Sequence, residues 1–345
     1  MGVKIFDIIR SENISFKDLD NKVLVFDASL TIFQFMSTIR QADGSLLTDS
    51  KGNVTSHLIG LFSRTVNFMQ KGMKLVFVFD GKPPELKSKE KERRKQLKKE
   101  ALEKFEEARQ EKDIEAMKKY AARTSYIDKD IIQESKSLLD ALGIPIVQAP
   151  CEADAQMAHI VKKGDAYATV TQDADALLYA TPRIVRNLSA SLKKKSNIRF
   201  KNVALELISF KDVLKELDLT LNQLIVIGIL IGTDYNVGGI KGIGSKKALK
   251  LIKQYGDDFD SLFKEVKWDE YFDYPWEDVF DTIKTMEVTD DYILDFKDPD
   301  NEKIIDLLCK KHDFSLDSVN NKLDKLYRFI EDNKTSDSSL NQWFG

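Results

Sequence analysis

The chain has 345 residues, 42% of them hydrophobic, which is enough to bury a sizeable core and to form two or three domains or one core with insertions. Its longest apolar run, residues 224–231, is far shorter than the roughly 20 residues that cross a bilayer, and the early Asp7 and Arg10 argue against a signal peptide. The two cysteines and three histidines show neither a CxxC pair nor metal-ligand spacing, so a disulfide framework and a zinc site are not indicated. We expect a cytoplasmic protein without membrane contact.

The net charge of −3 conceals a strong asymmetry along the chain. Residues 82–99 contain nine Lys or Arg and three Glu, whereas residues 257–306 contain eighteen acids and five bases. A basic segment on an acidic protein indicates a local anion-binding surface. A solvated charged helix explains such a run equally well when the run is taken alone.

Four short segments have the continuous apolar, β-branched or aromatic character of buried strands. They are residues 23–26, 75–79, 144–147 and 167–171. Helical patterns at residues 54–69 and 129–142 lie between them, and this alternation predicts an α/β fold with a mainly parallel central sheet flanked by helices. In such sheets the functional site lies at the carboxyl ends of the strands.

The rest of the chain divides into segments of different character. Residues 82–125 form a Lys/Glu-rich helical insertion that is too polar to be core, and an all-helical region is expected after residue 205. We expect an N-terminal region at 1–98 overlapping the insertion at 82–125, an internal region at 126–258, a helical region at 259–330 and a flexible polar tail at 331–345.

Acidic residues follow each of the four predicted strands. With one acid further along the chain, the candidates are Asp27, Asp80, Glu152, Asp154, Asp173, Asp175 and Asp234. Because the carboxyl ends of parallel strands meet at one edge, six of the seven can converge there. Side chains two residues apart in an extended chain point to the same side, so the acid pairs at 152/154 and 173/175 can each address one ligand.

Crowded carboxylates repel one another and call for cations. Oxygen-only ligands suit Mg²⁺ or Mn²⁺, and two such ions roughly 3.5–4 Å apart activate a water and stabilise a phosphoryl leaving oxygen. Phosphodiester hydrolysis is therefore the chemistry that this pattern favours. Any one aspartate taken alone is more often a turn or helix-cap residue.

A glycine-rich stretch at residues 238–247 has the character of a helix-hairpin-helix turn, in which backbone N–H groups can approach a phosphate. Ser245 is expected to cap the following helix, while Lys246 and Lys247 supply positive charge. The stretch does not fit a P-loop, because Ser and not Lys follows Gly244. A purely structural turn remains the alternative.

Five short motifs carry the acids, in the order 25–29 (VFDAS), 79–84 (FDGKPP), 152–155 (EADA), 171–175 (TQDAD) and 232–235 (GTDY). They resemble the motif series of flap endonucleases, the structure-specific 5′ nucleases of archaeal and eukaryotic type, and the resemblance covers nearly the whole chain. It implies a PIN-like 5′ nuclease core formed by residues 1–98 and 126–258. It also implies that residues 82–125 form a helical arch, a gateway for a single-stranded 5′ flap, and that residues 226–255 form the helix-hairpin-helix.

The resemblance further implies a role for each acid and for two basic residues. Asp80, Glu152 and Asp154 would serve one divalent ion, Asp173 and Asp175 the other, and Asp27 and Asp234 would act through bound waters. Lys87 and Arg94 match a family Lys and Arg that reach the scissile phosphate and stabilise its developing charge. All nine residues are expected to be catalytic, with two Mg²⁺, or Mn²⁺, as cofactors.

Further positions match DNA contacts of the family. They are Gly2, Phe33, Arg40, Arg64, Gly242, Gly244, Lys246 and Lys247. Phe33 stands where the family commonly has a Tyr that stacks on a base, and stacking depends on the π face that Phe retains. Family members also bind K⁺ at the hairpin while they grip duplex DNA through its phosphates.

The last residues resemble the peptide that docks on the replicative sliding clamp. Leu340, Trp343 and Phe344 match its apolar anchors, whereas Asp337 replaces the usual leading Gln. The alternative is an aromatic end that folds back onto the core. No basic tail follows, which favours a cytoplasmic archaeal-type enzyme over a nuclear eukaryotic one, and we expect a monomer.

The resulting hypothesis is a metal-dependent 5′ flap endonuclease with 5′-3′ exonuclease activity on branched DNA in replication, including Okazaki fragment processing, and in repair. A relative that acts mainly as an exonuclease or on bubbles shares the same acids. A non-catalytic, clamp-tethered junction binder and a PIN-like ribonuclease remain further alternatives, although neither needs both the crowded acids and the glycine-rich turn.

Overall fold

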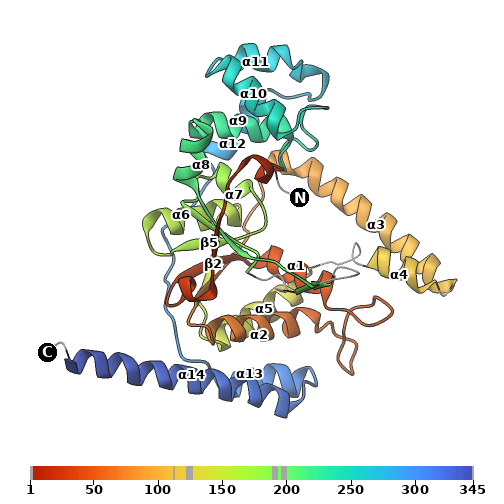
Figure 1. Ribbon diagram of the computed structural model, residues 1–345. Coiled ribbons are helices and arrows are strands. Elements are labelled where there is room, and N and C mark those ends of the chain that lie inside the picture. Colours follow the sequence, from red (N-terminus) through yellow and green to blue (C-terminus); the bar gives the residue numbers. More distant parts are fainter. Residues whose placement is uncertain (1–2, 112, 122–126, 189–192, 196–199, 344–345) are drawn as a thin grey trace.

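A seven-stranded mixed sheet lies at the centre of the protein, for which a computed structural model describes residues 3–111, 113–121, 127–188, 193–195 and 200–343 (Figure 1). The strand order is β1-β9-β6-β5-β2-β3-β4. The five strands from β6 to β4 are parallel, whereas β9 runs antiparallel to both β6 and β1. The predicted α/β fold with a mainly parallel sheet is thus confirmed.

The strands of this sheet are β1 (Glu12–Ile14), β2 (Val23–Asp27), β3 (Lys74–Phe79), β4 (Ile146–Gln148), β5 (Ala168–Val170), β6 (Arg183–Arg186) and β9 (Leu205–Ser209). A separate two-stranded sheet pairs β7 (Lys193–Lys195) with β8 (Phe200–Asn202). The four strands expected from the sequence correspond to β2, β3, β4 and β5. The expectation of helices directly after residue 205 is wrong, because residues 206–209 of β9 pair with β6 before the next helix begins at Phe210.

Side chains of the central strands alternate between two buried layers, as the two-residue period of a strand requires. Phe26 and Phe77 face the layer of α1 (Ala28–Thr38), α2 (Ser56–Met69) and α5 (Lys129–Ala141). Val25 and Val76 face α6 (Ala153–Lys163) on the other side. Both faces are covered, which explains why these strands are continuous apolar runs.

A second apolar core lies at one end of the sheet, in the upper part of Figure 1. It is built by α7 (Asp175–Leu178), α8 (Phe210–Leu217), α9 (Leu221–Ile231), α10 (Ser245–Tyr255), α11 (Phe259–Glu265) and α12 (Trp276–Lys284). The longest apolar run of the sequence belongs to α9, which is buried at its centre. The short helices η1 (Phe6–Ile8), η2 (Phe16–Leu19) and η4 (Trp268–Glu270) connect larger elements.

The basic insertion consists of η3 (Glu85–Lys87) and two helices, α3 (Ser88–Gln110) and α4 (Ile114–Ala121), that project from the body (Figure 1). The helices pack against each other, and Lys104 Nζ lies 5.8 Å from the centre of the Tyr120 ring. Few of their described side chains are buried, in agreement with the expected polar arch.

The C-terminal chain returns to the α2 and α5 layer through α13 (Asn301–Ile305), η5 (Asp306–Lys311) and α14 (Leu316–Trp343). The tail expected from residue 331 continues as helix to Trp343. The side chains of Leu340 and Trp343, and all of Phe344, lie outside the described residues, so the clamp peptide stays a prediction. In the described chain no helix is long and apolar enough to cross a membrane.

Candidate active site

All seven candidate acids line one cavity of about 830 Å³ at the carboxyl edge of the sheet. Asp27 ends β2, Asp80 follows β3, and the remaining acids lie on turns and helix starts after β4, β5 and α9. The convergence predicted from the strand ends is therefore present, and Asp234, which follows a helix, joins it from the second core.

Helix starts hold several of these carboxylates in place. Asp27 caps α1 by accepting a hydrogen bond from the Leu30 N–H at 2.8 Å. The extended backbone does not run through either acid pair: Glu152 is extended, but Asp154 lies in the first turn of α6 and Asp175 is the first residue of α7. Carboxylates at helix N-termini face unsatisfied N–H groups and the positive end of the helix dipole, which favours the helical geometry here.

Two further hydrogen bonds connect an acid to a backbone N–H group in a distant part of the chain. Asp80 Oδ1 accepts from the N–H of Ala153 at 3.0 Å, so an acid after β3 caps α6. Asp175 Oδ1 accepts from the N–H of Val3 at 2.8 Å, which anchors the N-terminal segment at the cavity. Neither contact has a local sequence signal, because each joins residues more than 70 positions apart.

The site strongly disfavours ionised acids in the absence of a cation. Burial, followed by repulsion from Asp80, raises the pKa of Asp27 to about 8. Burial and then Asp173 raise the pKa of Asp175 to about 7. Burial and repulsion from Asp27 also raise the pKa of Asp154 well above its usual range.

Lys87 is the cation that the chain itself supplies to this cavity. Its Nζ lies 2.5 Å from Glu152 Oε2 and 3.4 Å from Asp234 Oδ2. Burial lowers the pKa of Lys87, but the surrounding carboxylates outweigh that effect and raise it to about 12. The ammonium is therefore charged throughout the neutral range and neutralises one side of the acid cluster.

The donor set fits a hard divalent cation. All seven side chains are carboxylates, the ligand type that Mg²⁺ and Mn²⁺ prefer, and a bound cation removes the repulsion that raises their pKa values. Among the described residues, no three Asp, Glu, His or Cys side chains close around one point as the ligands of a single ion do.

The arch lines the side of the cavity opposite the sheet. Arg93, Leu97 and Lys104 of α3 and Tyr120 of α4 contribute, together with Phe33 of α1. Phe33 thus lies beside the acids, its stacking on a base stays a prediction, and the side chain of Arg94 lies outside the described part of the chain. Sequence reasoning missed Arg93 and Lys104, although spacings of three and four residues along α3 place such side chains on one helix face.

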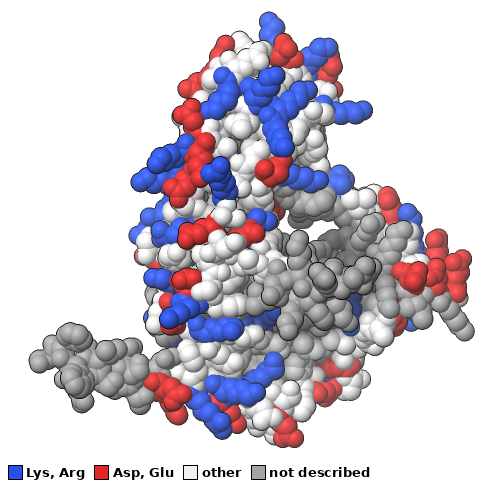
Figure 2. All heavy atoms as spheres, in the orientation of Figure 1, with Lys and Arg blue, Asp and Glu red and all other residues white. Residues whose placement is uncertain are grey.

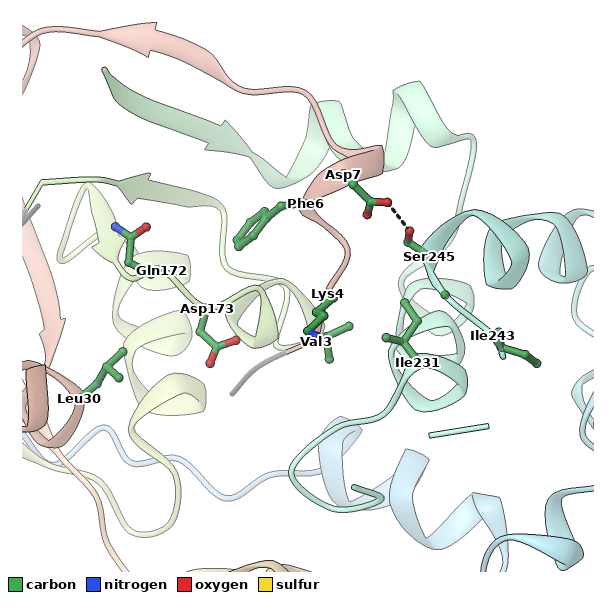
Figure 3. Close-up of a pocket in the computed structure, with 11 residues that line it drawn as sticks. Val3, Lys4, Phe6, Asp7, Leu30, Gln172, Asp173, Ile231, Ile243 and Ser245 are labelled. Atoms are coloured by element: carbon green, nitrogen blue, oxygen red, sulfur yellow. Dashed lines mark hydrogen bonds between the residues drawn. The ribbon is translucent and has the colours of Figure 1, made fainter. Parts of the chain in front are cut away.

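The glycine-rich turn joins α9 to α10, as expected for a helix-hairpin-helix. Gly242 has a φ of +81° that favours glycine, and Lys246 and Lys247 are exposed on α10. Figure 2 shows Lys and Arg side chains gathered over this upper helical part. The prediction that Ser245 caps α10 is wrong: Gly244 is the cap residue, and Ser245 Oγ donates to Asp7 Oδ2 at 2.7 Å because the N-terminal segment packs against this turn (Figure 3).

A second cavity of about 830 Å³ leads from the acids to this turn (Figure 3). Its lining runs from Asp173 past Lys4 and Asp7 to Gly244 and Ser245. The N-terminal segment forms its wall, with Val3 bonded to Asp175 at one end and Asp7 bonded to Ser245 at the other. The acidic cavity and the glycine-rich turn are therefore parts of one continuous surface.

The remaining expected DNA contacts lie elsewhere. Arg40 donates from Nη1 to the Gly44 carbonyl at 2.8 Å and thereby holds a loop after α1. Arg64 is half-buried on α2, and Gly2 lies outside the described residues. Contact of these three residues with DNA stays a prediction.

Comparison with known proteins supports one family over the whole chain. The XPG N-terminal domain matches residues 1–101, and the XPG I-region matches residues 143–234. Flap endonuclease 1 of Pyrococcus furiosus is 46% identical over 100% of this chain and 99% of its own length. Flap endonuclease 1 of Thermofilum pendens is 44% identical over the full length of both chains.

Solved structures agree with the sequence relatives. The flap endonuclease-1 structure from Methanococcus jannaschii has a TM-score of 0.75 at 40% identity, covering 96% of this chain and 100% of that one. The catalytic core of Rad2, solved in complex with a DNA substrate, shares the fold with a TM-score of 0.70 at 24% identity, over 94% of this chain and 100% of its own. This chain belongs to the flap endonuclease 1 family and is a nuclease that acts on phosphodiester bonds.

Proposed function

We propose that this chain is a structure-specific 5′ flap endonuclease with 5′-3′ exonuclease activity, acting where single-stranded DNA joins a duplex during replication, including Okazaki fragment processing, and repair. The observation that carries the proposal is the cavity in which seven carboxylates face two arch helices. Full-length relatives named flap endonuclease 1 support the same function.

The family is one of metal-dependent nucleases, and the carboxylate cavity fits this requirement. Two divalent ions, Mg²⁺ or Mn²⁺, supply an activated water and stabilise the leaving oxygen when bound. Asp80, Glu152 and Asp154 would hold one ion and Asp173 and Asp175 the other, while Asp27 and Asp234 would act through bound waters. The raised pKa values mean that cation binding and proton release are coupled in this site.

Lys87 is proposed to exchange its carboxylate partners for a phosphate when DNA binds. In the DNA-free protein its ammonium is paired with Glu152 and Asp234. A scissile phosphate entering the cavity offers it a second anion, and a fixed positive charge there stabilises the phosphorus centre as negative charge develops. Arg94 is proposed to act with it from the same arm.

The arch is suited to a single strand of DNA. Phe33 and Tyr120 offer aromatic faces and Leu97 an apolar surface, while Arg93 and Lys104 supply positive charge. Stacking on aromatic rings and phosphate contact with basic side chains bind single strands without reading their sequence. These contacts explain how the cavity would accept a 5′ flap of any sequence.

The glycine-rich turn would grip the adjoining duplex. Gly242 and Gly244 leave open space where a Cβ would lie, so a phosphate can approach the backbone closely. Lys246 and Lys247 would add charge, and a K⁺ ion is proposed to bind at the hairpin. Such contacts position DNA without specifying sequence.

The C-terminal residues Leu340, Trp343 and Phe344 are proposed to attach the enzyme, as a monomer, to a sliding clamp. The replacement of the usual Gln by Asp337 is expected to weaken this contact. We place the enzyme in the cytoplasm of an archaeal-type cell, or in the nucleus of a eukaryotic one.

The test is cleavage of an end-labelled double-flap DNA with and without Mg²⁺, beside matched blunt duplex and single-stranded RNA. Metal-dependent incision at the flap base is the expected result. Tight junction binding without incision would support the non-catalytic binder instead, and preferential cutting of RNA would support a PIN-like ribonuclease.

A further inference from the structure

Two tyrosine hydroxyls form a buried hydrogen-bonded pair behind the acid cluster. Tyr179 Oη and Tyr235 Oη lie 2.7 Å apart, and either can be the donor. Tyr235 is buried and Tyr179 is half-buried between α7 and α9. Within the described chain, neither hydroxyl has another hydrogen-bond partner, so one of the two O–H hydrogens is left to be donated elsewhere.

The pair and the acids share a small cavity of about 20 Å³. Its lining combines the two tyrosines with Lys87, Thr233 and the acids Glu152, Asp154, Asp175 and Asp234. A cavity of this size holds one water molecule when two to four polar groups surround it. The hydroxyls and carboxylates among its lining residues meet that condition.

The positions of the tyrosines in the chain connect them directly to two acids. Asp175 and Tyr179 are four residues apart across the single turn of α7, which places them on the same side of that helix. Tyr235 follows Asp234 in the turn after α9. The hydroxyl pair therefore bridges the two chain segments that carry these acids.

Hydrogen bonds to its backbone N–H and carbonyl hold Tyr235 in place. Its N–H donates to Thr233 Oγ1 at 3.1 Å, and its carbonyl accepts from the Tyr274 hydroxyl at 2.9 Å. Thr233 Oγ1 in turn donates to Asn236 Oδ1 at 2.7 Å. A fixed Tyr235 can hold Tyr179, and with it the α7 turn, in one orientation.

A neutral donor suits this place better than a cation. Lys87 neutralises carboxylates but competes with a metal ion for them, whereas a hydroxyl supports the ionised acid and leaves its charge available. Both tyrosine hydroxyls are neutral donors, so they add no charge to the cavity that the acids line. A carboxylate held by such a hydrogen bond keeps its orientation and its charge.

We infer that Tyr179 and Tyr235 act as a positioning pair which, through a water in this small cavity, orients the acids of α6 and α7 for divalent-metal binding. The inference rests on the proposed metal-dependent function and assigns the pair no contact with DNA. It predicts that loss of the Tyr179 hydroxyl changes metal affinity and leaves chemistry at saturating metal intact.

The experiment is Tyr179→Phe, which removes one oxygen and keeps the ring, with Mn²⁺ binding measured by electron paramagnetic resonance in the DNA-free protein. We expect Mn²⁺ affinity to fall about three- to tenfold and the half-saturating Mg²⁺ for flap cleavage to rise equally, with kcat at saturating Mg²⁺ within about twofold. The matched control is Tyr327→Phe, whose hydroxyl bonds the Pro299 carbonyl on another part of the protein. Its metal affinity should equal that of the wild type.

Two outcomes would overturn the inference. One is a folded Tyr179→Phe protein with wild-type Mn²⁺ affinity. The other is a Tyr179→Phe/Tyr235→Phe double variant whose loss equals the product of the single losses, because the members of one hydrogen-bonded unit are not additive. Since Mn²⁺ binding is measured without DNA, failure of the wild type to cut flaps would refute the proposed function and leave this test standing.

Discussion

The Lys87 ammonium lies 2.5 Å from the Glu152 carboxylate and occupies the acid cavity as an internal counter-ion. The same side chain is the one proposed to contact the scissile phosphate. Its charge is therefore held in the site before substrate arrives, in a partly buried position where it is not strongly hydrated.

Lys87→Met should lower the single-turnover cleavage rate by at least about 100-fold, because the substitution removes charge that acts mainly in the transition state. Junction affinity, measured with Ca²⁺ in place of Mg²⁺, should change by less than about threefold. The control is Lys129→Met, an exposed residue at the start of α5. A variant that binds poorly but cleaves at the normal rate once bound would contradict the catalytic role.

Asp175→Asn should abolish cleavage and leave junction binding in Ca²⁺ largely intact. The amide oxygen can still accept the Val3 hydrogen bond, so the change removes the charge with little loss of local structure. Asp269→Asn, at an exposed position on η4, serves as the control and should retain full activity. Unchanged turnover in Asp175→Asn would remove Asp175 from the metal site.

The stability of the metal-free protein should fall as pH rises from about 4 to about 8. Asp27 and Asp175 have folded-state pKa values of about 8 and about 7, raised from the 3.8 of an unperturbed Asp. A raised pKa contributes stability that is complete below the unfolded value and is lost as pH rises through the folded value. Between the unfolded and folded pKa values, the unfolding free energy falls by at most about 1.4 kcal/mol per pH unit for each such proton.

Thermal denaturation across that pH range, with EDTA and with Mg²⁺, checks this expectation. Mg²⁺ requires ionised acids, so its stabilising effect should be larger at pH 8 than at pH 6. Asp175→Asn cannot titrate and should show a shallower slope than the wild type. Equal slopes for the two proteins would show that Asp175 is not protonated in the folded state.

His57 should make the protein sensitive to acid. The imidazole is fully buried, its Nε2 lies 3.4 Å from Glu134 Oε2, and burial lowers its pKa from 6.5 to about 4. A lowered pKa contributes stability that is present above the unfolded value and is lost as pH falls toward the folded value, which amounts to about 3 kcal/mol between pH 6.5 and 4.

Urea denaturation of the wild type and His57→Leu between pH 7 and pH 4 checks this prediction. As pH falls, the unfolding free energy of the wild type should decrease more than that of the variant. A difference that is constant with pH would show that His57 is not held neutral. His159→Leu, at a more accessible position beside Asp290, is the matched control.

The sequence alone determined the central strands and the seven acids at their ends. Runs such as those of β2 and β3 are apolar on both faces because helices cover both sides of the sheet, and this local pattern is strong enough to predict. The motif order then identified the family, and the carboxyl-edge rule brought the acids together. The arch was also predictable, because its Lys/Glu-rich segment is helical yet too polar for a core.

Only the tertiary structure decided the features that join distant segments. β9 is a strand because β6 offers it a partner, and α6 begins at Ala153 because Asp80 of another segment caps it. The Lys87–Glu152 ion pair and the hydroxyl pair of Tyr179 and Tyr235 likewise link residues more than 50 positions apart. Hydrogen bonds and ion pairs depend on distance in space, which the spacing of residues along a chain does not contain.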